Sequence, residues 1–163
     1  MTTFQFPSAE FPALPTIALE SPDGWEPMDV GTALLAIGRT VPAGLFRPNV
    51  CVTMERFSGV LDIAGPSDAV IAKFASLDEF AEVGRELLTV SGFDAFRMEG
   101  GFHSTEAGTI FQAVYLICVV HGGFTDIVQA VASCTASETD TMIPEIRSIL
   151  TSIQVSRGGL DTH

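Results

Sequence analysis

The chain has 163 residues, 47% of them apolar, and a mean hydropathy of +0.37, values that exclude a protein disordered over most of its length. Twenty acidic residues face eight basic ones, and the formal net charge of -12 excludes nucleic acid as an expected partner, because such a chain repels phosphate backbones. A chain of this length is expected to fold as one domain.

The first fifteen residues are predicted to form an extended arm. Phe4, Phe6 and Phe11 stand among three prolines, which restrict φ and bias each preceding residue toward extended geometry. We expect this Phe/Pro-rich arm, residues 1–15, to lie against the domain, because three exposed phenylalanines would be a liability. A mobile arm would instead be a candidate segment for binding a partner.

The domain itself is expected to span residues 16–156 and to begin with strands. Short strands are predicted at residues 16–20 and 32–37, separated by a turn at residues 22–24 and followed by a loop at residues 41–48. Trp25 after the turn is the only tryptophan, which we expect to pack in the core or, alternatively, to form a wall of a ligand site. Strict alternation then predicts a strand over residues 49–57.

Two helical segments are predicted next. Ser67 is a candidate N-cap for a short helix that runs to Phe74. Ser76 with Glu79 matches the S-x-x-E capping box, and the following apolar residues repeat at helical spacing, so a stronger helix is predicted from there to Gly92.

Three strands in hairpin succession follow, at residues 93–102, 109–120 and 124–136. The middle one is apolar on both faces, so it is expected to be central in the sheet and covered on both sides. A second amphipathic helix is predicted near Thr141, and residues 157–163 form a polar tail that is expected to be flexible. This order predicts an α+β domain, a mainly antiparallel β-sheet with helices on both faces.

Four segments carry a family resemblance. The turn at residues 22–26, PDGWE, resembles the P-x-G-W-[DE] start common in the PsbP-like fold superfamily. Residues 49–59, NVCVTMERFSG, are similar to the N-x-x-V-x-x-x-[KR]-[LF]-[ST]-G segment of the actinobacterial LpqN/LpqT lipoprotein family. Residues 92–95 with 100–102 resemble the G-F-x-A and G-G-x-Y block of that family, and Gln112 with residues 114–120 fits its next strand.

The resemblance implies a PsbP-like α/β/α sandwich that binds hydrophobic molecules, glycolipids or proteins in a cavity between sheet and helix, without catalysis. It offers no catalytic motif to transfer. The lipobox and secretion signal of the lipoprotein family do not occur in this sequence.

The chain has twelve phenylalanines for one tyrosine, and a phenylalanine-lined sheet face beside a loosely packed helix would form an apolar ligand cavity. A filled core is the alternative interpretation. The candidate ligand-binding residues are Trp25, Phe57, Phe93, Phe96, Phe102 and Phe111.

Catalytic and metal sites are not predicted. The His121-Gly122-Gly123 sequence is similar to the HGG oxyanion segment of esterases, but the G-x-S-x-G motif that would complete the site does not occur, and a hairpin turn explains the glycines. His103 with Glu99 and Glu106 could offer metal ligands, although a surface histidine beside acidic residues is the more usual arrangement. Gly100 and Gly101 indicate either a bulge or space for a ligand or another backbone.

The three cysteines, Cys51, Cys118 and Cys134, lie in apolar runs and are expected to be buried and inert. The longest apolar run, residues 113–120, is too short to span a bilayer, and the sequence starts without a basic and apolar leader, so a cytoplasmic location is expected. The predicted function is a non-enzymatic binding protein without cofactor, for a lipid-like or glycolipid ligand. The alternative is a protein–protein interaction module, an adaptor or a homodimer, that uses a sheet edge or the N-terminal arm.

Overall fold

The computed structural model describes residues 1–158, which form nine strands, two α-helices and one short 3-10 helix in this part of the chain. In chain order the elements are β1 Thr16–Ala18, β2 Trp25–Pro27, β3 Leu35–Arg39, β4 Asn49–Ser58, α1 Ala64–Ala75, β5 Ala81–Val90, β6 Phe93–Ser104, β7 Gly108–His121, β8 Phe124–Thr135, the 3-10 helix Ala136–Glu138, α2 Thr139–Thr151 and β9 Gln154–Ser156.

Seven strands form one antiparallel sheet in the order β2-β3-β4-β8-β7-β6-β5. β7 lies inside this sheet between β6 and β8, where Tyr115 pairs with Arg97 on one side and with Ala130 on the other. The prediction that the doubly apolar strand is central is therefore confirmed. The two remaining strands, β1 and β9, pair with each other in a separate ribbon.

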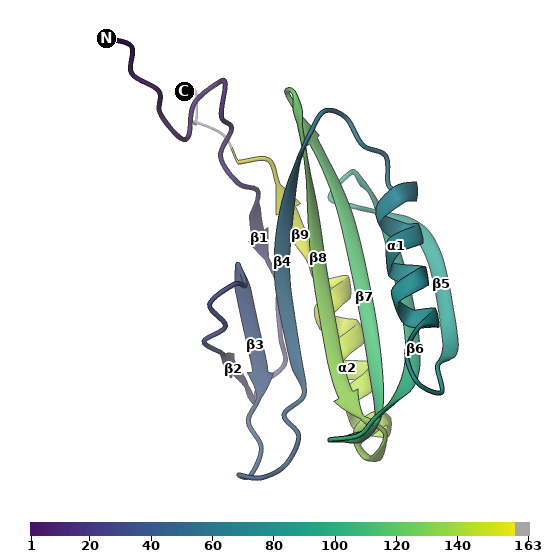
Figure 1. The fold of residues 1–163 in the computed structure, drawn as a ribbon. Helices are drawn as coiled ribbons and strands as arrows, with labels where there is room; N and C mark the ends of the chain where they lie inside the picture. The colour runs from purple at the N-terminus through teal and green to yellow at the C-terminus, as the bar shows by residue number, and fades with distance from the viewer. Residues whose placement is uncertain (159–163) are drawn as a thin grey trace.

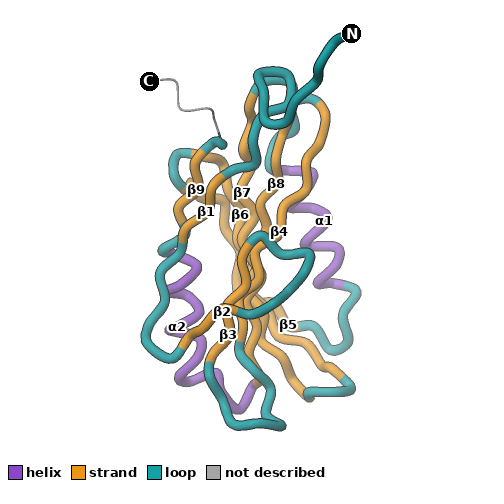
Figure 2. Tube along the Cα trace, turned by 90° about the vertical axis from the view of Figure 1, so that its left-hand side faces the viewer, coloured by secondary structure: helices purple, strands orange, loops and turns teal. Residues whose placement is uncertain are grey.

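The sheet is covered by a different helix on each face. Figure 2 shows α1 on one side of the sheet and α2 with the β1–β9 ribbon on the other. The predicted class, a mainly antiparallel α+β fold with helices on both faces, is confirmed.

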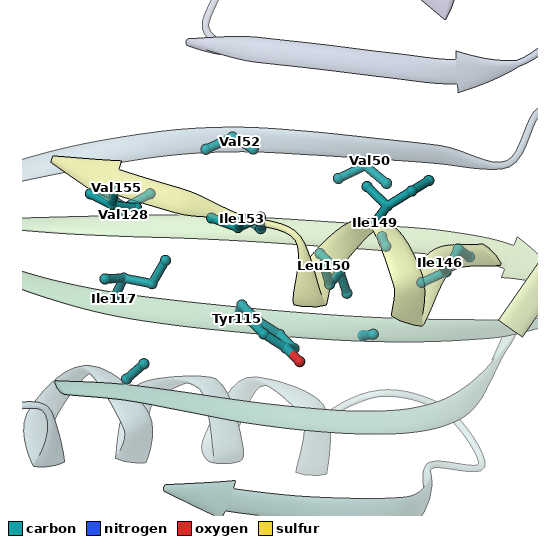
Figure 3. Close-up of a cluster of buried hydrophobic side chains, with 14 of the residues drawn as sticks. Val50, Val52, Tyr115, Ile117, Val128, Ile146, Ile149, Leu150, Ile153 and Val155 are labelled. Atoms are coloured by element: carbon teal, nitrogen blue, oxygen red, sulfur yellow. The ribbon is translucent and has the colours of Figure 1, made fainter. Parts of the chain in front are cut away.

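The larger core lies between α2 and the sheet. Ile146, Ile149 and Leu150 of α2 are at most 1% exposed and face Val50 of β4 and Tyr115 of β7 (Figure 3). The alternation predicted for β4 explains this packing, because even-numbered residues from Val50 point to the α2 side. Burial of these side chains holds α2 on the sheet.

The stronger helix predicted from Ser76 to Gly92 is wrong, because this segment forms β5, an edge strand paired with β6. Ser91 and Gly92 between the two strands both have positive φ, 53° and 82°, which is the geometry of a tight two-residue hairpin. The apolar residues of this segment fit both a helical and a strand period. Pairing with the long strand β6 satisfies its backbone groups and leaves Val83 and Leu87 exposed, 59% and 71%.

The other helix bounds also differ from the prediction. α1 begins at Ala64, three residues before the predicted cap, and Ser67 lies inside it, buried, with its Oγ donating a hydrogen bond to the carbonyl of Ile63 at 2.6 Å. β9 was not predicted. It forms because Val155 is buried in the α2-side core while its neighbours pair with β1.

The Gly100-Gly101 pair lies in regular pairing between β6 and β7, so the predicted bulge is not in this strand. The irregularity is in β5, between Glu82 and Gly84. A Cβ on Gly100 would lie 2.3 Å from Cε2 of Phe80 and 3.0 Å from the carbonyl oxygen of Ala81. The alternative interpretation, space for another backbone, therefore holds: the backbone at Ala81 and the ring of Phe80 lie against Gly100.

The Gly100→Ala variant is expected to lose about 1–3 kcal/mol of unfolding free energy, because the Phe80 ring and the β5 backbone must move away from the added methyl group. Urea denaturation monitored by circular dichroism measures this loss. The Gly84→Ala control adds the same methyl group where no atom lies within 4 Å, and it should change stability by well under 1 kcal/mol. Equal stability of the two variants would contradict the packing role of Gly100.

Candidate functional site

The main candidate site is a groove between α1 and the sheet, with a cavity volume of about 620 Å³. It forms because α1 packs through Val70 and Phe74 on β6 and β7, so that β4 and much of β8 remain uncovered on this face (Figure 1). We call it the α1 groove. Its apolar walls include Phe57, Val60, Leu61, Ala69, Leu116 and Ile127.

Charged and amide side chains line the same groove. Glu55 and Gln129 come from the sheet, Asp62 from the loop before α1, and Lys73 from the last turn of α1. Lys73 is the only lysine of the chain. The groove therefore combines an apolar surface with a polar margin, which is the usual composition of a site for a mainly hydrophobic ligand.

A second cavity of about 890 Å³ lies on the same face of the sheet, near the β6–β7 hairpin and the loop after β3. We call it the hairpin cleft. Phe46 and Phe102 contribute rings, and the rest is largely hydroxyl, amide and carboxylate groups, among them Gln112, Ser133 and Glu106. It is more polar than the α1 groove.

Strand β8 connects the two cavities. Its alternate residues on this face line them in succession, Ile127 and Gln129 in the α1 groove and Ser133 and Thr135 in the hairpin cleft. A small cavity of about 70 Å³ between them is lined by Gln129 and Val131. The span from residue 127 to residue 135 is about 27 Å at the rise of an antiparallel strand. One elongated ligand could therefore follow β8 along both cavities.

Two of the six predicted ligand-binding residues line these cavities, Phe57 in the α1 groove and Phe102 in the hairpin cleft. Phe96 is 4% exposed in the α1-side core and Phe111 is 5% exposed in the α2-side core. Both are therefore enclosed by other side chains.

Trp25 and Phe93 pack against the core on the α2 side of the sheet, the face opposite both cavities. The indole Nε1 of Trp25 donates a 2.8 Å hydrogen bond to Glu145, which also accepts a 2.6 Å hydrogen bond from Arg39. These contacts connect β2 and β3 to α2. The Arg157 guanidinium lies 5.1 Å from the centroid of the Phe93 ring.

A buried ionic cluster that the sequence analysis did not single out lies around Arg56, near the C-terminal end of β4. The carboxylate of Asp126 is 0% exposed and accepts two 2.7 Å hydrogen bonds from Arg56, and its Oδ2 lies 2.6 Å from Nε2 of His121. Burial raises the pKa of Asp126, but hydrogen bonds from Arg56 and His121 outweigh it and hold this pKa below its ordinary value. The signal in the sequence was one carboxylate within the apolar run of β8.

The same arginine holds the N-terminal arm. Arg56 donates to the carbonyl of Pro12 at 2.6 Å and to that of Ala13 at 3.2 Å. Phe4, Phe6 and Phe11, by contrast, are 79%, 58% and 42% exposed, so the expectation that the arm phenylalanines lie against the domain is wrong. The reason is that Arg56 binds only the carbonyl groups near the end of the arm.

Of the two acidic residues considered with His103, Glu99 forms an ion pair within the fold. Glu99 is 3% exposed and its two carboxylate oxygens accept 3.1 Å and 2.7 Å hydrogen bonds from Arg147 of α2. Among residues 1–158 no group of three histidine, cysteine or acidic side chains is placed to hold a metal ion. Gly122, in the sequence similar to an oxyanion segment, lies in the β7–β8 hairpin with φ of 56°.

The cysteines are free thiols, with Cys118 and Cys134 buried and Cys51 half-buried. Burial raises the pKa of all three, that of Cys134 to about 11, so the thiolate forms are disfavoured at neutral pH. Within the described part of the chain, no helix is both long and apolar enough to cross a membrane.

Comparison with known proteins places these features in a family. The family described as "Probable lipoprotein LpqN" matches residues 5–156. No curated protein matches the chain significantly.

Solved structures share the fold. LpqN of Mycobacterium tuberculosis, described as involved in cell envelope biogenesis, is 21% identical with a TM-score of 0.72, over 87% of this chain and 84% of that one. The cyanobacterial PsbP of Synechocystis sp. PCC 6803 is 11% identical with a TM-score of 0.56, over 96% and 98%. A protein from Pseudomonas aeruginosa, a putative regulator called PA94, is 13% identical with a TM-score of 0.50, over 86% and 96%.

The cytoplasmic location expected from the sequence is wrong. A family of probable lipoproteins matches nearly the whole chain, and one similar structure is that of a protein involved in cell envelope biogenesis. The family match contradicts a cytoplasmic location. The expectation relied on the first residues of the sequence, whereas the family match covers residues 5–156.

Proposed function

We propose that this chain, which belongs to the LpqN family of probable lipoproteins, is a non-enzymatic binding protein that holds a lipid-like or glycolipid ligand in the α1 groove. The role of M. tuberculosis LpqN in cell envelope biogenesis supports such a ligand, because the molecules of an envelope are largely amphiphilic.

The observation that carries the proposal is the apolar groove of about 620 Å³ beside α1. Val60 and Ala69, which line it, are exposed. A hydrocarbon chain placed there would release the water from these walls, at about 0.8 kcal/mol for each buried methylene group. About ten methylene groups would contribute about 8 kcal/mol, the free energy of a micromolar complex before the cost of association is subtracted.

The hairpin cleft supports the glycolipid form of the ligand. A sugar offers many hydroxyl groups and apolar ring faces, which fit the amide and hydroxyl groups of Gln112 and Ser133 and the rings of Phe46 and Phe102. We propose that the ligand places its tail in the α1 groove and its polar head in this cleft, along β8.

The His121–Asp126 pair does not favour an enzyme. Catalytic pairs of this kind activate a hydroxyl or thiol nucleophile. In the described residues the hydrogen-bond partners of His121 Nε2 are Asp126 and Arg56, and Arg56 fixes the carboxylate on both oxygens. This geometry supports a structural role.

The Ala69→Trp variant tests the ligand site. Ala69 is an exposed residue of α1 that lines the groove, so an indole there fills the cavity without entering the core. We expect its affinity for the probe dodecyl maltoside, measured by isothermal titration calorimetry below the micelle concentration, to fall at least about tenfold, a loss of 1.4 kcal/mol or more. Native mass spectrometry after incubation with a total lipid extract should show the same loss of adducts.

The matched control is Ala75→Trp. Ala75 is also exposed on α1, but it does not line the groove, and this variant should bind the probe as the unchanged protein does. No binding by the unchanged protein, or equal binding by the two tryptophan variants, would refute the proposed site.

A further inference from the structure

We propose that the free edge of β4 binds the N-terminal segment, residues 2–6, of a second copy of this chain as an added antiparallel strand. The occupant is a segment of the same protein, and the readouts below do not depend on lipid binding.

The edge exists because β4 is longer than its neighbour β3. Pairing between them ends at Leu35 and Val52, whereas pairing of β4 with β8 continues to Ser58. Val50 and Val52 turn their backbone groups toward β3, and the alternation of a strand turns those of Met54, Arg56 and Ser58 to the same side. In residues 1–158 no backbone hydrogen bond joins these three residues to another strand on that side.

Within residues 1–158, the segment that we assign to this edge pairs with no strand. Residues 2–6 read TTFQF, with β-favouring residues and the two phenylalanines on one face of an extended chain. Phe4 and Phe6 are 79% and 58% exposed. In Figure 1 the N-terminus leads away from the end of the sheet, so this segment extends toward solvent and can reach another molecule.

Charge and register favour this pairing. A chain with a net charge of -12 repels its own copies, but residues 2–6 carry no charged side chain. If Gln5 pairs with Arg56, Phe4 and Phe6 fall on the same face as Phe57, which lines the α1 groove. The second copy would then contribute two aromatic side chains to the groove.

The other long edge of the sheet is a poor alternative. β5 has an irregularity between Glu82 and Gly84, and charged side chains at Glu82, Arg85 and Glu86. Bulges and charges on an edge strand are features that prevent strand addition. Residues 54–58 of β4, by contrast, pair with β8 in regular register.

Single cysteines in separate chains test the pairing directly. In the proposed register Thr3 is opposite Ser58 at about 5.5 Å between Cα atoms, within the range of a disulfide. Thr3→Cys and Ser58→Cys chains, each with Cys51→Ala, are mixed under mild oxidation, and a disulfide-linked heterodimer is expected on a non-reducing gel. The control mixture pairs Thr3→Cys with Glu86→Cys on β5, and it should yield at least about tenfold less product.

Sedimentation equilibrium provides the second measurement. The unchanged protein should approach twice the chain mass of 17.3 kDa with increasing concentration, and the variant without residues 1–6 should remain at the chain mass. The double variant Phe4→Ser, Phe6→Ser should dimerise at least about tenfold more weakly, whereas the control Phe11→Ser, outside the paired segment, should not.

Three results in these mixtures and variants would overturn the inference, and a fourth comes from a chain with both cysteines. They are a monomer at all concentrations, a dimer that persists without residues 1–6, and equal crosslinking at Ser58→Cys and Glu86→Cys. A chain with both Thr3→Cys and Ser58→Cys that crosslinks within itself while monomeric would also overturn it, because the segment would then occupy its own edge.

Discussion

The Asp126→Asn variant is expected to lose about 3 kcal/mol of unfolding free energy at neutral pH. The carboxylate is 0% exposed and is held by Arg56 and His121, so its neutralisation leaves the guanidinium without its counter-charge in a partly buried position. Breaking a buried ion pair from one side costs about 3–5 kcal/mol, and the 20% exposure of Arg56 places this pair at the lower end. Urea denaturation at neutral pH measures the loss.

The pH dependence of stability provides an independent check on Asp126. Its folded-state pKa is lowered below 3.8, so the carboxylate contributes stability that is fully present above its unfolded pKa of about 3.9. This contribution is lost as the pH falls through the lower, folded-state pKa. The unchanged protein should therefore lose stability below about pH 4 more steeply than the Asp126→Asn variant.

Asp68→Asn is the matched control. Asp68 is an exposed residue of α1, so the same change should alter stability by no more than about 0.5 kcal/mol. If Asp126→Asn were as stable as this control, the cluster would not stabilise the fold.

The Ile146→Ala variant should lose about 2–5 kcal/mol of unfolding free energy, a second large effect. Ile146 is 0% exposed in the core between α2 and the sheet, where a shortened side chain leaves a cavity (Figure 3). Because α2 covers one face and the α1 groove lies on the other, probe binding at temperatures well below the unfolding midpoint should be retained.

Two measurements on Ile146→Ala distinguish a loss of stability from a loss of ligand binding. Thermal unfolding reports the loss of stability, and calorimetry with dodecyl maltoside reports the groove. Ser148→Ala, an exposed position on the same helix, is the control and should change neither quantity by more than about 0.5 kcal/mol. A loss of probe binding in Ile146→Ala comparable to that of Ala69→Trp would contradict the assignment of the ligand to the α1 face.

The arrangement of β7 was predictable from sequence because its residues alternate between two apolar faces. Phe111, Tyr115 and Ile117 enter the α2-side core, and Val114 and Leu116 enter the α1-side core. A strand with this pattern is stable only inside a sheet covered on both sides. The antiparallel order of β6, β7 and β8 followed from short turns between strands.

The segment from Ser76 to Val90 shows where local pattern was insufficient. Its apolar residues match helical spacing, and Ser76 with Glu79 matches a capping box, yet it pairs with β6 as an edge strand. The alternation of β5 is weak because exposed positions also carry apolar side chains, and Leu87 is 71% exposed. Pairing with β6 through the Ser91-Gly92 hairpin decided the outcome.

Phe57 was among the predicted ligand-binding residues and lines the α1 groove, but the other residues of the groove were not predicted. The α1 groove depends on where α1 rests across the strands, which is set by the packing of Val70 and Phe74 on β6 and β7. The Asp126 cluster likewise joins Arg56, His121 and the arm carbonyl of Pro12 from separate parts of the chain.

The sequence by itself determined the alternation of β4, β7 and β8, the hairpin turns and the apolar face of α2, because each depends on the order of neighbouring residues. Only the tertiary structure decided that β5 is a strand, that β4 extends beyond β3, and that a groove remains beside α1. These features depend on which surfaces meet and which remain uncovered, and that balance of burial is settled by contacts between whole elements, not by the order of neighbouring residues.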